Sequence, residues 1–309
     1  MQITNDALRA IFTSFNTTLQ AAIDTTPLFW DKIAFKVPSA ARQNVYGWMA
    51  ELPHMREWIG ERIVRNLVAN AYTLVNKDYE LTIGVSRNDI LDDQLGVYGP
   101  RMQMMGMSAA KLPDDLTASA MINGSTNLAW DGQPFFNTSH PVGDAAGNVY
   151  SNYSASGMAL TSANYNSVKS TMASYIGASG KAMGITPNLL IVPPQLELAA
   201  RQILYGQTTA PAAAAGQNAA NVQSTNMLIG SANLVVVPEL ASQPTAWYLA
   251  DATKPVKAII WQERQAPQMV PLANPEDPNV FFRKEYIYGV DSRGAVGYSL
   301  PFLMYKAVA

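Results

Sequence analysis

The chain has 309 residues, of which 48% are hydrophobic and only 14% are charged, with a formal net charge of −2 and no cysteine. This composition excludes a disulfide-stapled fold, thiol catalysis and cysteine metal sites, and it argues against a basic surface that grips nucleic acid. A typical soluble domain has roughly 25% charged residues, so the deficit predicts that much of this surface faces other protein.

The N-terminal region begins with a predicted amphipathic helix at residues 5–24, where apolar side chains recur at three- and four-residue steps. Thr4 or Asn5 can cap its start, and Pro27 ends it. Residues 28–44 are expected to be extended and irregular. We find no secretory signal pattern and no apolar run near the ~20 residues of a membrane helix, so we expect a cytoplasmic origin.

The next region predicts strands and then a helix. Residues 71–87, AYTLVNKDYELTIGVSR, alternate apolar and polar side chains, which predicts a β-hairpin with its turn at residues 76–78. Residues 89–122 predict a long helix in pieces, which Pro100 and Pro113 should kink or restart. Its clustered methionines predict that the helix is covered on more than one side. These are Met102, Met104, Met105 and Met107.

From residue 160 to residue 260 the chain alternates predicted helices and strands. The helical segments are residues 162–176 and 195–205, and the strand segments are residues 188–193, 233–240 and 257–263. Between them, residues 206–224 are uncharged and rich in Ala, Gly, Gln and Asn, which predicts a mobile loop. The alternating pattern of residues 280–309 predicts returning strands.

The segment DGQPFFNTSHP, residues 131–141, raises the question of a hydrolase, because it holds Asp131, Ser139 and His140. A catalytic serine needs a base within hydrogen-bond reach, whereas neighbouring side chains usually diverge, and no G-x-S-x-G motif is present. We therefore favour a structural turn at residues 131–132, anchored by Phe135-Phe136.

Other chemistry finds little support. The two histidines, His54 and His140, are far apart and lack an HExxH pattern. GASGKAMG at residues 177–184 fails the phosphate-loop spacing. Trp48 and Trp58 suit a protein interface or a core better than a ligand platform. We predict no catalytic residue, metal site or cofactor.

Several long stretches resemble the major head subunit of Mu-like phages and prophages, in one order along nearly the whole chain. They are VYGWMAELPHMREWIGERIVRNL, YTLVNKDYELTIGVSRNDILDDQLGVYGP, WDGQPFFNTSHPV, LVVVPEL with WYLAD, and YGVDSRGAVGYSLP.

This resemblance implies an α+β capsid protein of the Hong Kong 97 (HK-97) type, with five parts. They are an N-terminal arm (1–43), an extended E-loop (44–86), a P-domain with a long spine helix (87–155), an A-domain (156–260), and strands that return to the P-domain (261–309). Residues 131–141 then connect the spine helix to the A-domain.

The family's function is to form pentamers and hexamers that close into an icosahedral head around double-stranded DNA. The expected partners are therefore copies of the chain, scaffold and portal proteins, decoration proteins, and DNA bound without sequence preference. The expected location is the virion, after assembly in the host cytoplasm. The alternatives are a cytoplasmic hydrolase that uses residues 131–141 and a phage surface decoration module.

The E-loop is expected to act in assembly, because a lone two-stranded hairpin is marginal in water and can bury its aromatic side chains only on a neighbour. The expected assembly contacts are Trp48, Arg56, Trp58, Glu61, Arg62, Lys77 and Glu80.

Overall fold

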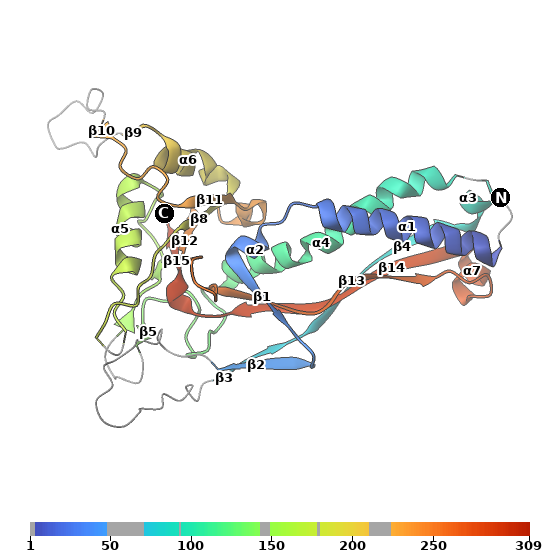
Figure 1. Ribbon diagram of the computed structural model, residues 1–309, viewed down its shortest axis with the longest axis horizontal. Helices are drawn as coiled ribbons and strands as arrows, with labels where there is room; N and C mark the ends of the chain where they lie inside the picture. The colour runs from blue at the N-terminus through green and yellow to red at the C-terminus, as the bar shows by residue number, and fades with distance from the viewer. Residues whose placement is uncertain (1–3, 48–70, 93, 143–148, 178–179, 210–223) are drawn as a thin grey trace.

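The structure is a computed structural model that describes residues 4–47, 71–92, 94–142, 149–177, 180–209 and 224–309. The molecule is elongated (Figure 1). A five-stranded sheet with two helices forms one end, and a four-stranded sheet under two long helices extends to the other end.

The helices of the described residues are α1 (Asn5–Thr25), α2 (Trp30–Ile33), α3 (Arg87–Leu91), α4 (Tyr98–Asn123), α5 (Ser162–Ala173), α6 (Glu197–Tyr205) and α7 (Pro278–Arg283), with short 3-10 turns η1 (Leu95–Val97), η2 (Pro194–Leu196), η4 (Pro238–Ser242) and η5 (Pro301–Leu303). The strands are β1 (Ala34–Pro38), β2 (Gln43–Gly47), β3 (Ala71–Val75), β4 (Lys77–Ser86), β5 (His140–Pro141), β6 (Val149–Tyr150), β7 (Tyr153–Ser154), β8 (Leu189–Val192), β9 (Thr208–Thr209), β10 (Ser224–Thr225), β11 (Asn233–Val236), β12 (Ala246–Ala250), β13 (Ile259–Leu272), β14 (Glu285–Tyr298) and β15 (Met304–Val308).

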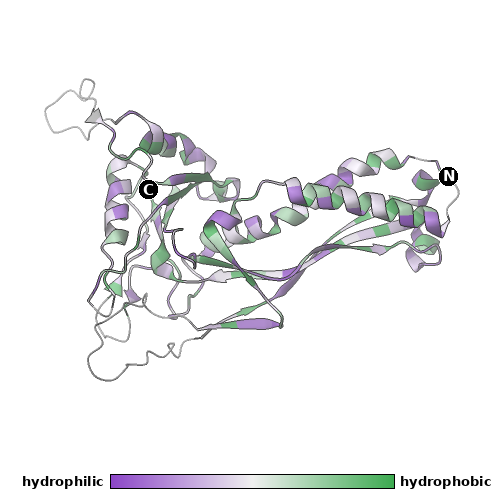
Figure 2. Ribbon diagram, viewed as in Figure 1, coloured by the Kyte–Doolittle hydropathy of each residue, from purple (hydrophilic) through white to green (hydrophobic). Residues whose placement is uncertain are grey.

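Helices α1 and α4 pack side by side over the long sheet (Figure 1). The side chain of Thr4 caps α1, as one of the two predicted caps, by accepting a hydrogen bond from the N–H of Ala7 at 3.2 Å. Both helices carry hydrophobic and hydrophilic residues along their length (Figure 2). At Gly106 the helices approach so closely that an added Cβ would lie 2.6 Å from the carbonyl oxygen of Leu19, so only glycine fits there.

Helix α4 differs from its prediction in two ways. The segment is broken into α3, η1 and α4 as expected, but Pro113 lies inside one continuous helix. Met102 and Met105 are buried, whereas Met104 and Met107 are exposed. Helix α4 is covered on two sides, by α1 and by the long sheet, as expected, but Met104 and Met107 do not take part in this packing.

The four-stranded sheet has the order β1-β13-β14-β4. Its centre is the antiparallel pair of β13 and β14, each 14 residues long. Strand β1 pairs with β13 in parallel, so residues 34–38, which were expected to be extended but irregular, form a regular edge strand. Strand β4 forms the other edge by pairing with β14.

The predicted hairpin turn at residues 76–78 is wrong. Strand β3 pairs with β2, whereas β4 pairs with β14. The chain passes from one sheet to the other at Asn76, a buried residue between the two strands. Residues 77–86 therefore lie in the subunit's own long sheet, and the β2–β3 ribbon leaves from its side (Figure 1).

The five-stranded sheet, with the order β11-β8-β12-β15-β7, contains the larger hydrophobic core. Every residue of β8 and β12 is buried, so this sheet is covered on both faces. Strand β15 pairs with β12. Residues 304–308, near the C-terminal end, therefore lie in the same sheet as β8, β11 and β12. The middle of the predicted mobile loop, residues 210–223, lies outside the described residues.

Candidate functional site

The segment 131–141 forms a tight turn around Gly132. The backbone N–H of Gly132 donates to the carbonyl oxygen of Ala129 at 3.2 Å, and Gly132 has a φ of +77°, a conformation that favours glycine. Phe135 and Phe136 are both buried in the larger core. The interpretation of this segment as an anchored turn agrees with this geometry.

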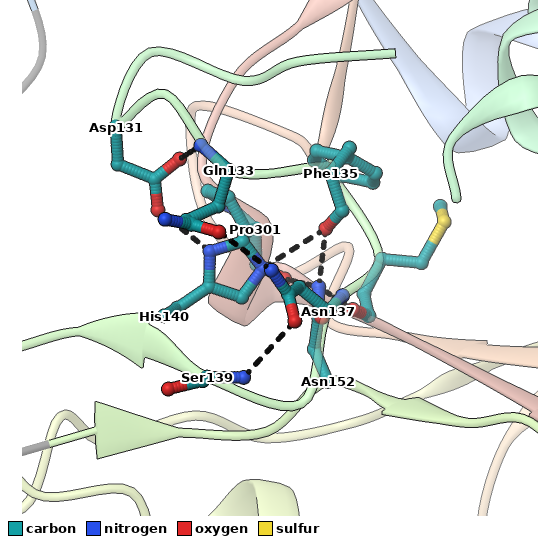
Figure 3. A network of polar contacts seen from close by, with 9 residues as sticks. Asp131, Gln133, Phe135, Asn137, Ser139, His140, Asn152 and Pro301 are labelled. Carbon is teal, nitrogen blue, oxygen red and sulfur yellow. Dashed lines mark hydrogen bonds and ion pairs between the residues drawn. The ribbon is translucent and has the colours of Figure 1, made fainter. Parts of the chain in front are cut away.

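The imidazole of His140 is fully buried and has a partner at each ring nitrogen (Figure 3). Its Nδ1 lies 2.6 Å from Oδ2 of Asp131, and its Nε2 lies 3.2 Å from the carbonyl oxygen of Phe135. Ser139 is exposed, and its backbone N–H donates to Oδ1 of Asn137 at 3.3 Å. Because both ring nitrogens of His140 are already engaged, the ring is not positioned as a base for Ser139.

Asn152 ties this turn to the C-terminal part of the chain (Figure 3). Its buried side-chain amide nitrogen donates to the carbonyl oxygens of Phe135, Pro301 and Met304 at 2.8, 3.0 and 3.2 Å. Its Oδ1 accepts from the N–H of Asn137 at 2.8 Å. No local sequence pattern predicts this role of Asn152.

Lys306 is a buried cation on β15, with an exposed fraction of 4%. Its ammonium nitrogen lies 5.6 Å from the ring centroid of Phe136 and 5.7 Å from that of Tyr248, and it donates to Oγ of Ser125 at 3.3 Å. Burial lowers the pKa of Lys306 to about 8, because the charged form is poorly solvated there. No sequence pattern indicated this residue.

The base of the β2–β3 ribbon is fastened to the long sheet by buried polar groups. Gln262 on β13 donates through Nε2 to Oδ1 of Asn76 at 2.6 Å and to the carbonyl oxygen of Leu74 at 3.2 Å. Its Oε1 accepts from the hydroxyl of Tyr46 at 2.8 Å. Asn76 in turn donates to Oγ of Ser39 at 2.9 Å. These contacts fix the direction in which the ribbon leaves the subunit.

The expected assembly residues fall into two groups. Trp48, Arg56, Trp58, Glu61 and Arg62 lie outside the described residues.

The other two, Lys77 and Glu80, are exposed on β4, at the edge of the long sheet. Glu80 accepts a hydrogen bond from Oγ1 of Thr82 at 2.6 Å. An ion pair on the same strand joins Oδ1 of Asp78 to Nε of Arg293 at 3.0 Å.

A metal or membrane role gains no support from the described part of the chain. His54 lies outside the described residues, and His140 is already bonded to Asp131. Within the described ranges, no three His, Asp or Glu side chains gather as a metal site would require. None of the helices described is both long and apolar enough to cross a bilayer.

Comparisons with known proteins identify one family over nearly the whole chain. The sequence pattern of the family described as Mu-like prophage major head subunit gpT matches residues 8–159, 152–240 and 239–309. The chain is 28% identical over 298 residues to the major capsid protein of Escherichia phage Mu, covering 96% of this chain and 72% of that protein. It is 27% identical over 296 residues to the Mu-like prophage FluMu major head subunit of Haemophilus influenzae, covering 96% and 71%.

A solved structure shows the same arrangement of elements. The procapsid of bacteriophage JBD30 contains a chain that is 32% identical to this one, with a TM-score of 0.62. The match covers 99% of this chain and 76% of that chain.

Proposed function

The chain belongs to the Mu-like prophage major head subunit family and is a major capsid protein, and we propose that its copies close as pentamers and hexamers into an icosahedral head around double-stranded DNA. The observation that carries this proposal is the match of a procapsid chain to 99% of this sequence at 32% identity. The low content of charged residues supports it, because a subunit in a shell buries much of its surface on neighbours.

The fold is α+β and of the HK-97 type. We propose that residues 1–43 are the arm, 44–86 the E-loop, 87–155 the P-domain, 156–260 the A-domain and 261–309 the returning strands. Two pairings refine this division. Residues 77–86 lie in the long sheet, so the projecting part of the E-loop ends near Val75, and β15 joins the sheet assigned to the A-domain.

The E-loop is proposed to act in assembly. The polar cluster around Gln262 supports this, because it fixes the base of the β2–β3 ribbon on the long sheet. Anchoring aromatic side chains can contribute more than ~2 kcal/mol to an interface, whereas exposed ion pairs contribute under ~1 kcal/mol. Trp58 is therefore proposed as a main contact, and Glu61, Arg62, Lys77 and Glu80 as weaker ones.

The test compares Trp58→Ala with Glu61→Ala as the matched control on the same segment. We expect both subunits to give the circular dichroism of the wild type, and we expect a sharp loss of closed shells in sedimentation only for Trp58→Ala. Shells at normal yield from Trp58→Ala, or an unfolded subunit, would contradict the proposal.

Proteins other than copies of this chain are also proposed to bind the shell. We propose that scaffold, portal and decoration proteins bind the shell, and that the shell forms in the host cytoplasm and becomes part of the virion. A nearly neutral chain releases few counterions on DNA, which suits contact with packaged DNA without sequence preference and cargo that must later leave the head.

We also propose that the chain has no catalytic role and no cofactor. The geometry around His140 supports this for the one segment that suggested a hydrolase, since its two ring nitrogens are engaged. Ester hydrolysis by a folded wild-type subunit that disappears in Ser139→Ala would overturn this proposal and favour the hydrolase alternative.

A further inference from the structure

One side of β11, the strand at one end of the five-stranded sheet, has no neighbouring strand. The N–H of Asn233 donates to the carbonyl oxygen of Asn188 at 2.8 Å, on the side that faces β8. Since main-chain groups alternate in direction along a strand, the N–H and C=O groups of Leu234 and Val236 point to the opposite side. In the described part of the chain, no hydrogen bond to these outward groups is found.

The unpaired side of β11 borders a cavity of about 580 Å³, which Leu234 helps to line. The other walls come from separate parts of the chain. Lys32 belongs to α2, Tyr205 to α6, and Ala252 and Lys257 to the segment between β12 and β13. Helix α6 lies beside β11 (Figure 1). The unpaired main-chain groups therefore face open space between fixed walls, which is what an added strand would need.

The cavity carries a surplus of positive charge. Among the described residues that line it, Lys32 and Lys257 are basic and Asp31 alone is acidic. Lys32 is exposed, whereas Lys257 is half-buried and donates through its ammonium to the main-chain carbonyl oxygen of Asp31. Burial lowers the pKa of Lys257, because its charge is poorly solvated there. A carboxylate brought into the cavity would therefore be attracted to both ammonium groups.

Charge and main-chain pairing together select the kind of partner. If β11 met β11 of a second copy, Lys32 and Lys257 of both copies would be brought together, which like-charge repulsion opposes. Nucleic acid carries the complementary charge, but it has no row of N–H and C=O groups to pair with a strand. An extended peptide with carboxylate side chains meets both requirements, since its main chain pairs with the strand edge and its side chains meet the lysines.

We propose that an extended acidic segment of another protein binds in this cavity as an added strand beside β11. Its main chain pairs with the outward N–H and C=O groups of Leu234 and Val236, and its carboxylates lie near Lys32 and Lys257. This inference goes beyond the proposed shell, because it assigns a binding site for a different protein to each subunit. Its test requires no assembly.

The first test titrates the free subunit of the full chain with a fluorescein-labelled peptide in which glutamate and valine alternate. Fluorescence anisotropy measures the binding. One control peptide has lysine in place of glutamate, and another keeps the glutamates but has methylated main-chain nitrogens, which cannot donate hydrogen bonds. We expect the subunit to bind the first peptide and neither control, and we expect the binding to weaken as salt screens the lysines.

The second test changes the site. Leu234→Pro removes an outward N–H that β8 does not use, and Lys32→Glu reverses a charge of the cavity. The matched control, Lys181→Glu, makes the same change of charge at an exposed position outside the cavity lining. We expect each of the first two variants to weaken binding of the acidic peptide by about tenfold or more, with circular dichroism unchanged. The control should stay within about twofold of the wild type, because a distant charge is screened.

Several results would overturn the inference while leaving the proposed function intact. They are no binding of the acidic peptide, equal binding of either control peptide, and unchanged binding by Lys32→Glu. Dimerisation of the free subunit that Leu234→Pro abolishes would assign the edge to a second copy, and would overturn it as well. If Leu234→Pro fails to fold, Lys32→Glu and the methylated peptide decide. The absence of closed shells from the wild-type chain would instead count against the proposed function itself.

Discussion

At the scale of single residues, the buried polar groups around residues 131–152 hold the turn against the C-terminal strand. His140 bonds to Asp131 and to the carbonyl oxygen of Phe135, and Asn152 bonds to three carbonyl oxygens. A buried group that loses its partner costs more than the bond contributed. These residues therefore act on the stability of the subunit.

Substitution of His140 separates this structural role from a catalytic one. In His140→Ala, Asp131 and the carbonyl oxygen of Phe135 lose a partner in a buried place, so the free energy of unfolding should fall by about 1–3 kcal/mol. Ser139→Ala, at an exposed neighbour, should change it by less than about 0.5 kcal/mol. Urea unfolding of the free subunit, followed by circular dichroism, measures both values, and an equal loss in the two variants would contradict the prediction.

Lys306 makes the stability of the subunit depend on pH in an alkaline window. Its folded-state pKa of about 8 lies below the ordinary value of 10.5. Between these values the unfolded chain holds a proton that the folded chain has released, so the free energy of unfolding rises as the pH increases. Below pH 8 both states hold the proton, and the cost of burying the charge is present in full.

The test replaces Lys306 with methionine, which keeps an apolar stem without the charge. From pH 8 to pH 10 the wild type should gain more stability than Lys306→Met in parallel urea titrations, because other titrating groups contribute equally to both. Parallel pH profiles of the two proteins would show that the buried ammonium does not titrate in this range.

At the scale of elements, the close packing of α1 on α4 depends on the absence of a side chain at Gly106. An added Cβ would lie 2.6 Å from the carbonyl oxygen of Leu19 and 2.9 Å from Cβ of Ala22. The two helices would have to separate. The long sheet beneath them would then lose part of its cover, since Phe15 of α1 packs edge to face on Tyr288 of β14.

Two glycine substitutions on α4 should therefore have opposite effects. Gly106→Ala should lower the free energy of unfolding by about 1–3 kcal/mol through overpacking. Gly99→Ala meets nothing within 4 Å and should raise it by about 0.4–1 kcal/mol, because alanine loses less chain entropy on folding. Unfolding midpoints of the two variants in urea give the comparison, and stabilisation by Gly106→Ala would refute the packing argument.

At the scale of the whole molecule, the small number of charges sets how the shell responds to salt. With 14% charged residues and a net charge of −2, contacts between subunits should depend mainly on apolar burial. From about 0.01 M to about 1 M salt the Debye length falls from ~30 to ~3 Å. The fraction of closed shells in sedimentation should nevertheless change little across this range. Disassembly by salt alone, without denaturant, would show that ion pairs dominate.

The sequence predicted where strands lie better than it predicted which strands pair with one another. The alternation of residues 71–86 correctly predicted strands, but the polar residues 76–78 resembled a turn. Asn76 is instead buried and bonded to Gln262, which lies 186 positions along the chain. A local sequence pattern cannot predict a contact between residues so far apart in the chain. Lys306 and Asn152 escaped notice for the same reason, and the family resemblance, which spans the chain, supplied the fold that local patterns left open.

The pairing of β1 with β13 has a consequence for the time at which a newly made chain can fold. Ala34 pairs with Ile259, and synthesis at about 5–20 residues per second separates the two by roughly 10–45 s. Throughout this delay β1 has no strand beside it, and contacts between such distant segments form slowly. A nascent chain that stops before residue 259 therefore lacks β13 and β14, the two central strands, and cannot form the long sheet.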